Sequence, residues 1–357
     1  MQMEEPRVLV TFDSMKYPNS GLFYFGKSLG GALIEQNKGQ FMLNYYIHKR
    51  AIYRFENKVK LAELSKLHKV YFPFCNRFDL VHFTDQYCRL KPGKVNAKKV
   101  LTIHDLNPVH EKTRSARKMA RYLKRLGKYI SACDRIVAIS HFVEKDILKY
   151  FPQAQNKITV IYNGADKLNA AEEYKPQYIP PKKFIFTIGQ VSAKKNFHVL
   201  PALLADNDYQ LVIAGIITPY KDKILEEAAK YNCTDRITIT GTISDEDKAW
   251  YYQNCIAFVF PSLAEGFGLP VIEAMHFGKP VFLSKYTSLP EIGSDKAYYF
   301  DSFEPGIMQD AFLKGMQDFE QNNRAPELAD YASRFSWDNT ARQYLSLYLE
   351  CLSLTTQ

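Results

Sequence analysis

The sequence predicts two doubly wound α/β domains, each a parallel β-sheet with helices on both faces. Three observations predict this class. The chain has 357 residues, more than one hydrophobic core usually supports. Runs rich in β-branched and aromatic residues alternate with helical patterns along its whole length. Several runs are almost continuously apolar, as expected for strands that helices cover on both faces.

Twelve runs are predicted as strands. In the first half of the chain they cover residues 7–12, 41–47, 79–84, 99–105, 135–140 and 158–164. In the second half they cover residues 183–189, 209–215, 236–241, 255–262, 279–284 and 297–301. Twelve strands separated by helices indicate two sheets rather than one oversized sheet.

The break between the domains lies in a polar, proline-containing stretch. Pro176, Pro180 and Pro181 interrupt NGADKLNAAEEYKPQYIPPKK, where no helix or strand period persists. Such a stretch is typical of a linker. The predicted first domain, linker and second domain cover residues 1–165, 166–182 and 183–336.

The last segment, FSWDNTARQYLSLYLECL, predicts one further helix at about residues 337–357. One face of it carries Tyr344, Leu345, Tyr348 and Leu349. Because the second domain is already complete, this apolar face needs another surface. We expect the helix to cross back onto the first domain.

The composition is that of a soluble globular protein, with 46% hydrophobic and 24% charged residues. The six cysteines show neither a CxxC pair nor Cys/His ligand spacing, which favours free thiols in a reducing compartment. No stretch reaches the roughly 18 consecutive apolar residues of a membrane span. We expect a cytoplasmic protein, either free or peripheral on the inner face of the plasma membrane.

The formal net charge of +9 is concentrated in one place, residues 111–130. The stretch EKTRSARKMARYLKRLGKYI sets cations at helical spacing: Arg114, Arg117, Lys118, Arg121, Lys124, Arg125 and Lys128. Its apolar residues fall on or near the opposite face: Met119, Tyr122, Leu123, Leu126 and Ile130. A basic amphipathic helix of this kind binds anionic lipid or nucleic acid phosphates, or is simply a solvated surface helix.

The stretch SLAEGFGLPVIEAMHFGKPV, residues 262–281, combines a turn, a helix start and two glutamates. Pro270 suits the first turn of a helix, whose free N–H groups bind anions such as phosphate. Glu265 precedes the turn, and Glu273 is expected in the first turn of the helix. Carboxylates accept hydrogen bonds from vicinal hydroxyls, so the pattern fits a sugar nucleotide. Alternatively, Glu273 only favours the helix dipole and Glu265 is solvated.

Two lysines follow the first predicted strand of the second domain. Ligands of open α/β sheets bind outside the carboxyl ends of the strands. Lys194 and Lys195 stand there, in GQVSAKKN, where ammonium groups neutralise a diphosphate. The alternative is a pair of exposed loop lysines.

Two further positions lie at strand ends of the first domain. His104 closes the predicted strand 99–105, and Asp105 is expected to orient its ring for a hydrogen bond to substrate. Gly21, with Gly26 behind it, follows the first strand and permits close approach of backbone to a ligand. A structural role for the His-Asp pair is the alternative.

Together these stretches resemble family four of the glycosyltransferases, which are retaining sugar-nucleotide enzymes with the GT-B fold. The similar segments are TIHDLNPVH, DRIVAISHFVEKDI, KITVIYNGAD, GQVSAKKN, GTISDED, EGFGLPVIEAM, SLPEIGSDKAYYFD and FSWDNTARQYL. EGFGLPVIEAM matches the E-x7-E signature of that family. The resemblance implies two Rossmann-like domains that face a central cleft.

The resemblance also implies roles for individual residues. Glu273 would hold the donor ribose, Glu265 the hydroxyls of the transferred hexose, and Lys195 the diphosphate. His104 would face the donor sugar, and Gly21 would lie near the donor phosphates. The backbone near the donor would be that of Gly266, Phe267, Gly268 and Leu269.

Two positions depart from the family pattern. Lys194 stands where many relatives carry an arginine, and Gln190 replaces an arginine directly after the strand's glycine. Lysine lacks the bidentate fork of arginine, so a second diphosphate cation is left open. We expect no metal and no other cofactor, because lysines and a helix amino terminus take up the charge of the leaving group.

The similarity of TIHDLNPVH and SLPEIGSDKAYYFD to mannosyltransferases of polysaccharide and lipopolysaccharide assembly favours GDP-mannose as donor, with UDP-sugars as the alternative. The expected acceptor is a glycan or a lipid-linked oligosaccharide. Helix 111–130 is expected to contact an anionic membrane surface, and no nucleic acid partner is expected. The competing hypothesis is a non-enzymatic basic protein that binds membrane or nucleic acid through this helix.

Overall fold

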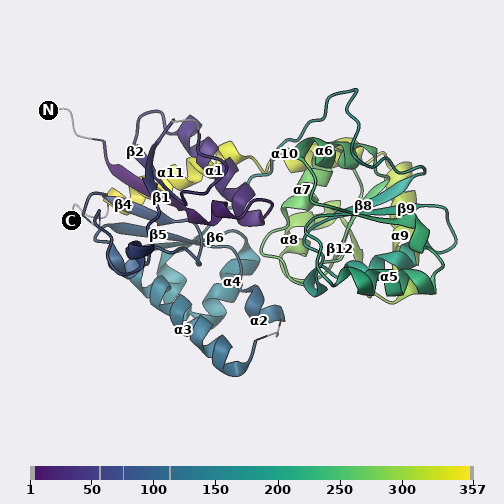
Figure 1. The fold of residues 1–357 in the computed structure, drawn as a ribbon, viewed down its shortest axis with the longest axis horizontal. Helices are drawn as coiled ribbons and strands as arrows, with labels where there is room; N and C mark the ends of the chain where they lie inside the picture. The colour runs from purple at the N-terminus through teal and green to yellow at the C-terminus, as the bar shows by residue number, and fades with distance from the viewer. Residues whose placement is uncertain (1–4, 56–57, 75, 112–113, 354–357) are drawn as a thin grey trace. The chain divides into compact units, whose positions relative to one another are not determined.

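The computed structural model describes residues 5–55, 58–74, 76–111 and 114–353. Its contacts divide the chain into two compact units (Figure 1). Unit 1 is Met1–Gly164 with Phe335–Gln357, and unit 2 is Ala165–Arg334.

Unit 1 is built on a seven-stranded sheet in the order β3-β2-β1-β4-β5-β6-β7. Every neighbouring pair is parallel. The strands are β1 Arg7–Phe12, β2 Met42–Ile47, β3 Lys60–Glu63, β4 Leu80–Phe83, β5 Lys98–Ile103, β6 Arg135–Ala138 and β7 Ile158–Val160. The order reverses between β1 and β4, which is where ligands bind in doubly wound sheets.

The edge strand β3 was absent from the sequence prediction. Its four residues, KLAE, are half-exposed or exposed and form no apolar run, so the hydrophobic pattern gives no signal. The predicted strand 99–105 ends at Ile103 in the structure. His104 therefore follows the strand instead of closing it.

Helices cover both faces of this sheet, with α1 and α11 on one side and α3 and α4 on the other (Figure 1). The α-helices are α1 Gly21–Gln36, α2 Asn107–Glu111, α3 Ala116–Ala132, α4 His141–Tyr150 and α11 Trp337–Ser353. The 3₁₀ helices are η1 Asp13–Lys16, η3 Lys66–Lys69, η4 Pro92–Lys94 and η5 Pro152–Lys157.

The basic helix is shorter than the predicted 111–130. It begins at Ala116, after Ser115 adopts extended backbone, while Glu111 ends α2. Arg114 precedes the helix, and residues 112–113 lie outside the described residues. Cations at helical spacing do not mark where a helix starts, so the predicted helix began at residue 111 instead of at Ala116. The buried face of α3 is the predicted one, with Tyr122, Leu126 and Ile130.

The C-terminal helix α11 packs on unit 1, which confirms the predicted return of the chain. Its Tyr348 hydroxyl bonds His82 Nδ1 of β4 at 2.6 Å, and its Tyr344 hydroxyl bonds Thr102 of β5 at 2.9 Å. Burial lowers the pKa of His82 to about 3, so this network is neutral. Leu349 was predicted on the apolar face but is exposed.

Unit 2 is a six-stranded parallel sheet in the order β10-β9-β8-β11-β12-β13. The strands are β8 Phe184–Ile188, β9 Gln210–Ala214, β10 Ile237–Gly241, β11 Ala257–Phe260, β12 Val281–Ser284 and β13 Tyr298–Phe300. The α-helices are α5 Lys221–Lys230, α6 Asp245–Asn254, α7 Leu269–His276, α8 Leu289–Gly293, α9 Pro305–Gln321 and α10 Ala325–Ser333. The 3₁₀ helices are η6 Ala193–Lys195, η7 Phe197–Leu204, η8 Thr234–Arg236 and η9 Ser294–Lys296.

The stretch predicted as a linker, 166–182, is grouped with unit 2. Tyrosine contacts explain this. The Tyr174 hydroxyl donates to Asp247 Oδ1 at 3.0 Å, and the Tyr251 hydroxyl of α6 donates to the Tyr178 carbonyl at 2.7 Å. None of the described helices is both long enough and apolar enough to span a membrane.

Candidate functional site

The glutamate motif of unit 2 lies where the chain leaves β11 and enters α7. Gly268 caps the helix with a φ of +110°, and a Cβ there would lie 2.9 Å from Leu289. The turn therefore requires glycine. Ser288 Oγ donates to the carbonyls of Glu265 and Phe267 at 3.1 and 3.0 Å, which fixes the loop in front of the helix.

The structure brings Glu265 and Lys195 together, although 70 positions separate them in the sequence. Lys195 Nζ lies 2.5 Å from Glu265 Oε1, and both side chains are mostly buried, at 13% and 15% exposure. Ser262 Oγ also donates to this carboxylate, at 2.5 Å. Glu265 is therefore an ion-paired carboxylate, and the alternative of a solvated glutamate is wrong.

Backbone contacts hold the lysine loop against the glutamate loop. Leu263 N–H donates to the Lys194 carbonyl at 2.7 Å. A Cβ on Gly189 would lie 3.0 Å from Lys195 Cε, so glycine leaves room for the lysine stem. Lys194 is half-buried and Gln190 is exposed. The two predicted segments thus form one site, with Lys195 at its centre.

Both carboxylate oxygens of Glu273 accept a hydrogen bond from a neighbouring side chain. Lys248 Nζ donates to Oε1 at 2.8 Å, and the Tyr252 hydroxyl donates to Oε2 at 2.9 Å. The lysine and glutamate side chains are 9% and 8% exposed. Burial raises the pKa of Tyr252 well above its usual range, and the Glu273 charge raises it further. The phenol therefore stays a donor.

The position of Glu273 corrects the sequence prediction. It is the fifth residue of α7, beyond the first turn, where the structure records no acidic residue. The alternative that it only favours the helix dipole is wrong, because the dipole acts within that turn. Sequence reasoning missed Lys248. A signal exists in DEDKAWYYQN, where this lysine shares a helix face with Tyr251 and Tyr252 and is buried.

In unit 1, His104 lies just beyond β5 with its ring fixed by backbone. Nε2 lies 2.8 Å from the Thr84 carbonyl, and the ring of Phe25 packs edge-on at 4.5 Å. The predicted partner differs: Asp105 Oδ1 accepts from Asn107 N–H at 3.0 Å, at the entry to α2. Asp105 lies on the turn, so the ring is oriented by the neighbouring strand end.

The tautomer of His104 follows from that contact. A carbonyl only accepts, so Nε2 carries the proton. Burial lowers the pKa of His104, which keeps the ring neutral. Nδ1 is then an acceptor. The ring can therefore accept a hydrogen bond from a substrate hydroxyl.

Two buried aspartates share this sheet edge and were missed by sequence reasoning. Asp13 and Asp85 follow the adjacent strands β1 and β4. Asp13 Oδ2 accepts from Arg89 N–H at 3.0 Å, and Asp85 Oδ1 accepts from Tyr87 N–H at 2.6 Å. Among the described residues, the other oxygen of each has no hydrogen-bond partner. The signal available was an aspartate directly or one residue after each apolar run.

These carboxyls hold protons at unusually high pH. Burial raises the pKa of both, and for Asp85 burial and the charge of Asp13 together raise the pKa to about 6. Two buried carboxylates close together repel each other, so the loss of both protons costs more free energy than the loss of one.

Gly21 and Gly26 of α1 have different reasons to be glycine. A Cβ on Gly26 would lie 2.6 Å from Met15 Cγ, so packing requires glycine there. A Cβ on Gly21 would meet nothing within 4 Å. Packing therefore does not explain Gly21, and its predicted role beside a ligand stays a prediction.

Comparison with known proteins names the family. A family model described as glycosyl transferases group 1 matches residues 171–335, and one described as glycosyltransferase family 4 matches residues 34–167. The chain belongs to the glycosyltransferases. The family that the motifs predicted is thereby confirmed.

Curated relatives of this glycosyltransferase include the serotype-specific mannosyltransferase WbdA of Escherichia coli. It is 31% identical over 266 residues, which cover 68% of the chain and 32% of WbdA. The chain thus spans about a third of the length of that relative. The O-antigen chain mannosyltransferase B of Escherichia coli is 27% identical, over 70% of the chain and 69% of the relative.

Solved structures of glycosyltransferases share the fold. Sucrose-phosphate synthase from Thermosynechococcus elongatus aligns with a TM-score of 0.77 at 18% identity, over 98% of the chain and 100% of that protein. Anabaena HepE in complex with UDP and glucose aligns with a TM-score of 0.70 at 14% identity, over 97% of the chain and 100% of that protein. The predicted GT-B fold of two Rossmann-like units is confirmed.

Proposed function

We propose that this chain is a retaining, metal-independent hexosyltransferase that moves a hexose from a nucleotide sugar to a glycan or lipid-linked oligosaccharide in cell-surface polysaccharide synthesis. The observation that carries the proposal is the pair of buried lysine-glutamate contacts on either side of the turn into α7. Lys195 pairs with Glu265 before the turn, and Lys248 pairs with Glu273 after it.

Glu273 is suited to bind the ribose. Its two oxygens are fixed by Lys248 and Tyr252, and each retains a lone pair for a ribose hydroxyl. The Lys248 ammonium also supplies a counter-charge 2.8 Å from this buried carboxylate, which orients it for hydrogen bonds from hydroxyls. Lys248 is a positioning residue in this scheme.

Lys195 and Glu265 are suited to bind the diphosphate and the hexose. In the free protein each neutralises the other across 2.5 Å. A donor that brings phosphate to Lys195 and hydroxyls to Glu265 replaces that contact with two ligand contacts. Lys195, Lys194 and the amino terminus of α7 then neutralise the charge that develops on the departing diphosphate.

His104 would accept a hydrogen bond from a hydroxyl of the donor sugar through Nδ1. The acceptor oxygen attacks the anomeric carbon on the face that the diphosphate leaves, and a leaving phosphate oxygen takes its proton. Glu265 therefore binds the sugar and forms no bond to it.

GDP-mannose is the proposed donor because the relatives WbdA and mannosyltransferase B are named for mannose transfer. A UDP-sugar is the alternative, since the HepE structure holds UDP. We propose that the enzyme works in the cytoplasm at the inner face of the plasma membrane, with α3 toward anionic lipid. A purely non-enzymatic binding role leaves both lysine-glutamate pairs without a purpose.

Thermal unfolding with GDP, UDP, ADP and dTDP in turn tests the proposal. A nucleotide at about 100 times its Kd stabilises the protein by about 2.7 kcal/mol. We expect GDP to raise the Tm of the unmodified protein and of a Glu227→Ala control, which loses the carboxylate that pairs with Lys230 on α5 of the same unit. Glu273→Ala should lose the shift. A shift with UDP alone would change the donor, and no shift with any nucleotide would overturn the proposal.

A further inference from the structure

Unit 1 has a cavity that the donor chemistry does not use. It has a volume of about 560 Å³ and lies between α3 and the segment that follows β4. This volume is in the range of small-molecule sites. The residues around it come from 86–91 and 121–129.

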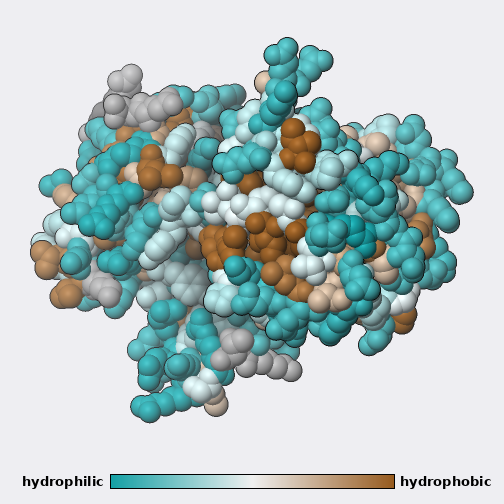
Figure 2. Space-filling view, turned by 45° about the vertical axis from the view of Figure 1, so that its right-hand side comes forward, coloured by the Kyte–Doolittle hydropathy of each residue, from teal (hydrophilic) through white to brown (hydrophobic). Residues whose placement is uncertain are grey.

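Positive charge dominates the wall of this cavity. Six cations line it: Arg89, Lys91, Arg121, Lys124, Arg125 and Lys128. No aspartate or glutamate is among the lining residues. Four of the six recur at i, i+3, i+4 and i+7 on α3, so one face of the helix presents them together. Figure 2 shows mostly hydrophilic side chains where α3 lies, at the bottom of unit 1.

The cations around the cavity have no ion-pair partner among the described side chains. Within the described part of the chain, none of the six forms an ion pair within 4.0 Å, whereas Lys98 of the same unit pairs with Asp134. Gathering like charges around one hollow costs free energy unless an anion enters it. The arrangement therefore favours an anionic ligand.

Two tyrosines supply hydrogen-bond donors to the cavity, and one of them restricts the position of an arginine. Tyr87 and Tyr129 line it, and burial raises the pKa of both, so their hydroxyls stay protonated. The Arg125 guanidinium lies 5.8 Å from the centre of the Tyr87 ring, which restricts where the arginine points. Arginine forks and phenol hydroxyls both donate to phosphate oxygens.

We propose that this cavity binds the diphosphate group of a lipid-linked acceptor. Cations on two walls can reach both phosphates of a diphosphate, which offers more acceptor oxygens over a longer span than a single phosphate does. The inference rests on the proposed function, since it assigns the acceptor of that reaction to a lipid diphosphate. The same phosphate chemistry is offered by the headgroups of bulk anionic lipid, so the test separates the two sources.

The test compares two charge-matched double variants on one helix. Arg121→Ala with Lys124→Ala removes cavity cations, and Arg117→Ala with Lys118→Ala removes exposed cations of α3 that do not line the cavity. Flotation measures binding of the full chain to phosphatidylcholine vesicles. One set carries a polyprenyl diphosphate, and the other carries phosphatidylglycerol at equal surface charge.

We expect the unmodified chain and the control to bind diphosphate vesicles at least tenfold more tightly than phosphatidylglycerol vesicles. The cavity variant should lose that preference. Equal binding to both vesicles, or equal losses in the two variants, would overturn the proposal in favour of general attraction to anionic surfaces. Displacement by a single-stranded oligonucleotide at lower concentration than by pyrophosphate would overturn it in favour of nucleic acid.

The thermal shift with nucleotide keeps the two proposals separate. The cavity variant should retain the GDP shift of the unmodified protein, and Trp337 fluorescence in denaturant checks that its unit 1 is folded. If the shift stands and the diphosphate preference fails, only the acceptor inference is wrong. If the preference stands and the shift fails, the diphosphate cavity survives and the proposed donor chemistry does not.

Discussion

The two units treat buried charge in opposite ways. In unit 2 the candidate site pairs each glutamate with a lysine, Lys195 with Glu265 and Lys248 with Glu273. In unit 1 the buried carboxyls of Asp13 and Asp85 influence each other, and neither forms an ion pair within the described residues; each accepts a backbone N–H at one oxygen. Unit 1 also gathers six cations around a cavity, and within the described part of the chain none of them forms an ion pair.

In unit 2 the fold itself supplies the counter-charge of each buried glutamate. In unit 1 the buried carboxyls need a proton, and the cavity cations need an anionic ligand. A glutamate paired with a lysine is oriented and has its counter-charge within the fold, which is what a hydroxyl-binding carboxylate needs. An unpaired buried carboxyl instead rises in pKa and keeps a proton. The candidate site of unit 2 is therefore preorganised. In unit 1 the charge of the two aspartates depends on pH, and the charge of the cavity is balanced when an anionic ligand binds.

Breaking a pair in unit 2 should have the largest effect. Lys248→Met leaves the buried Glu273 without its cation, which typically costs about 3–5 kcal/mol of unfolding free energy. Trp250 stacks on Phe184 within unit 2, so its fluorescence in denaturant, in a Trp337→Phe background, reports this unit. We expect a clear loss of stability in that signal.

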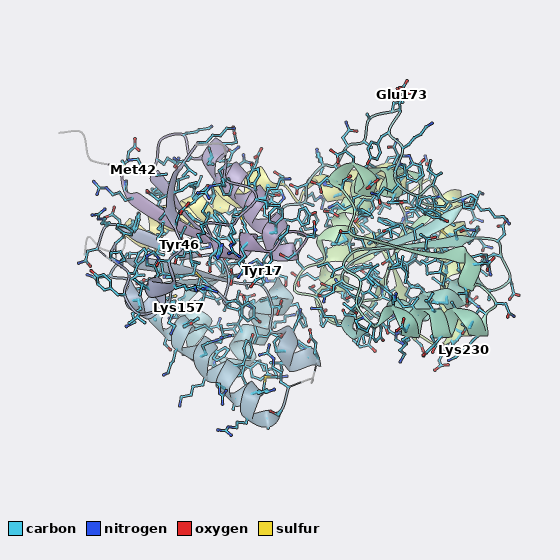
Figure 3. All side chains as sticks on the ribbon, viewed as in Figure 1. Tyr17, Met42, Tyr46, Lys157, Glu173 and Lys230 are labelled. Carbon is cyan, nitrogen blue, oxygen red and sulfur yellow. The ribbon has the colours of Figure 1, made fainter. Side chains whose placement is uncertain are left out.

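Two variants make this measurement decisive. Lys230→Met breaks an exposed pair with Glu227, and Figure 3 shows Lys230 on the outer edge of unit 2, so stability should not change measurably. Adding Glu273→Gln to Lys248→Met should restore much of the stability, because it removes the stranded charge. A similar cost for Lys230→Met would refute the distinction between buried and exposed pairs.

Removing a charge from unit 1 should stabilise it. The folded pKa of Asp85, about 6, lies above the ordinary 3.8, so the folded state holds the proton longer. Stability from this group is present below about pH 4 and is lost as pH rises through about 6. Asp85→Asn should therefore be more stable than the unmodified chain above pH 6, by up to about 3 kcal/mol.

The measurement is unfolding of unit 1 between pH 4 and 8, followed by Trp337 in a Trp250→Phe background. The stability difference should vanish near pH 4. Asp295→Asn in unit 2 is the control, followed by Trp250 in a Trp337→Phe background, because Asp295 is exposed and a hydrogen bond from Lys296 lowers its pKa. The stability gain above pH 6 should be absent from that variant. A constant difference for Asp85→Asn at all pH values would contradict the buried-proton account.

The smallest expected effect on stability is at Gly21. Gly21→Ala adds a Cβ that meets nothing within 4 Å, so the unfolding free energy should change by less than about 1 kcal/mol. Gly26→Ala is the contrast, because its Cβ would lie 2.6 Å from Met15 and should destabilise unit 1. If Gly21 exists for a ligand, Gly21→Ala weakens donor binding at unchanged Tm. Unchanged donor affinity would refute the predicted role.

The sequence by itself determined the two α/β units, the family and most strands, because these depend on local patterns. Apolar runs mark buried strands, and EGFGLPVIEAM marks a turn into a helix with a glutamate at each side. The return of α11 also followed from sequence, since an apolar helix after a finished domain must be covered. The edge strand β3 did not, because an exposed strand needs no apolar run.

Only the tertiary structure decided which charges meet. Lys195 and Glu265 were both predicted at the site, but their ion pair depends on two loops that the sheet places side by side. The sequence does not show that the Lys248 side chain is buried against Glu273, because that contact depends on how two helices pack. The pKa of Asp85 and the tautomer of His104 likewise depend on burial and on Thr84, a neighbour from another strand end. Pairing and desolvation act through space, so a linear pattern names the groups but not their states.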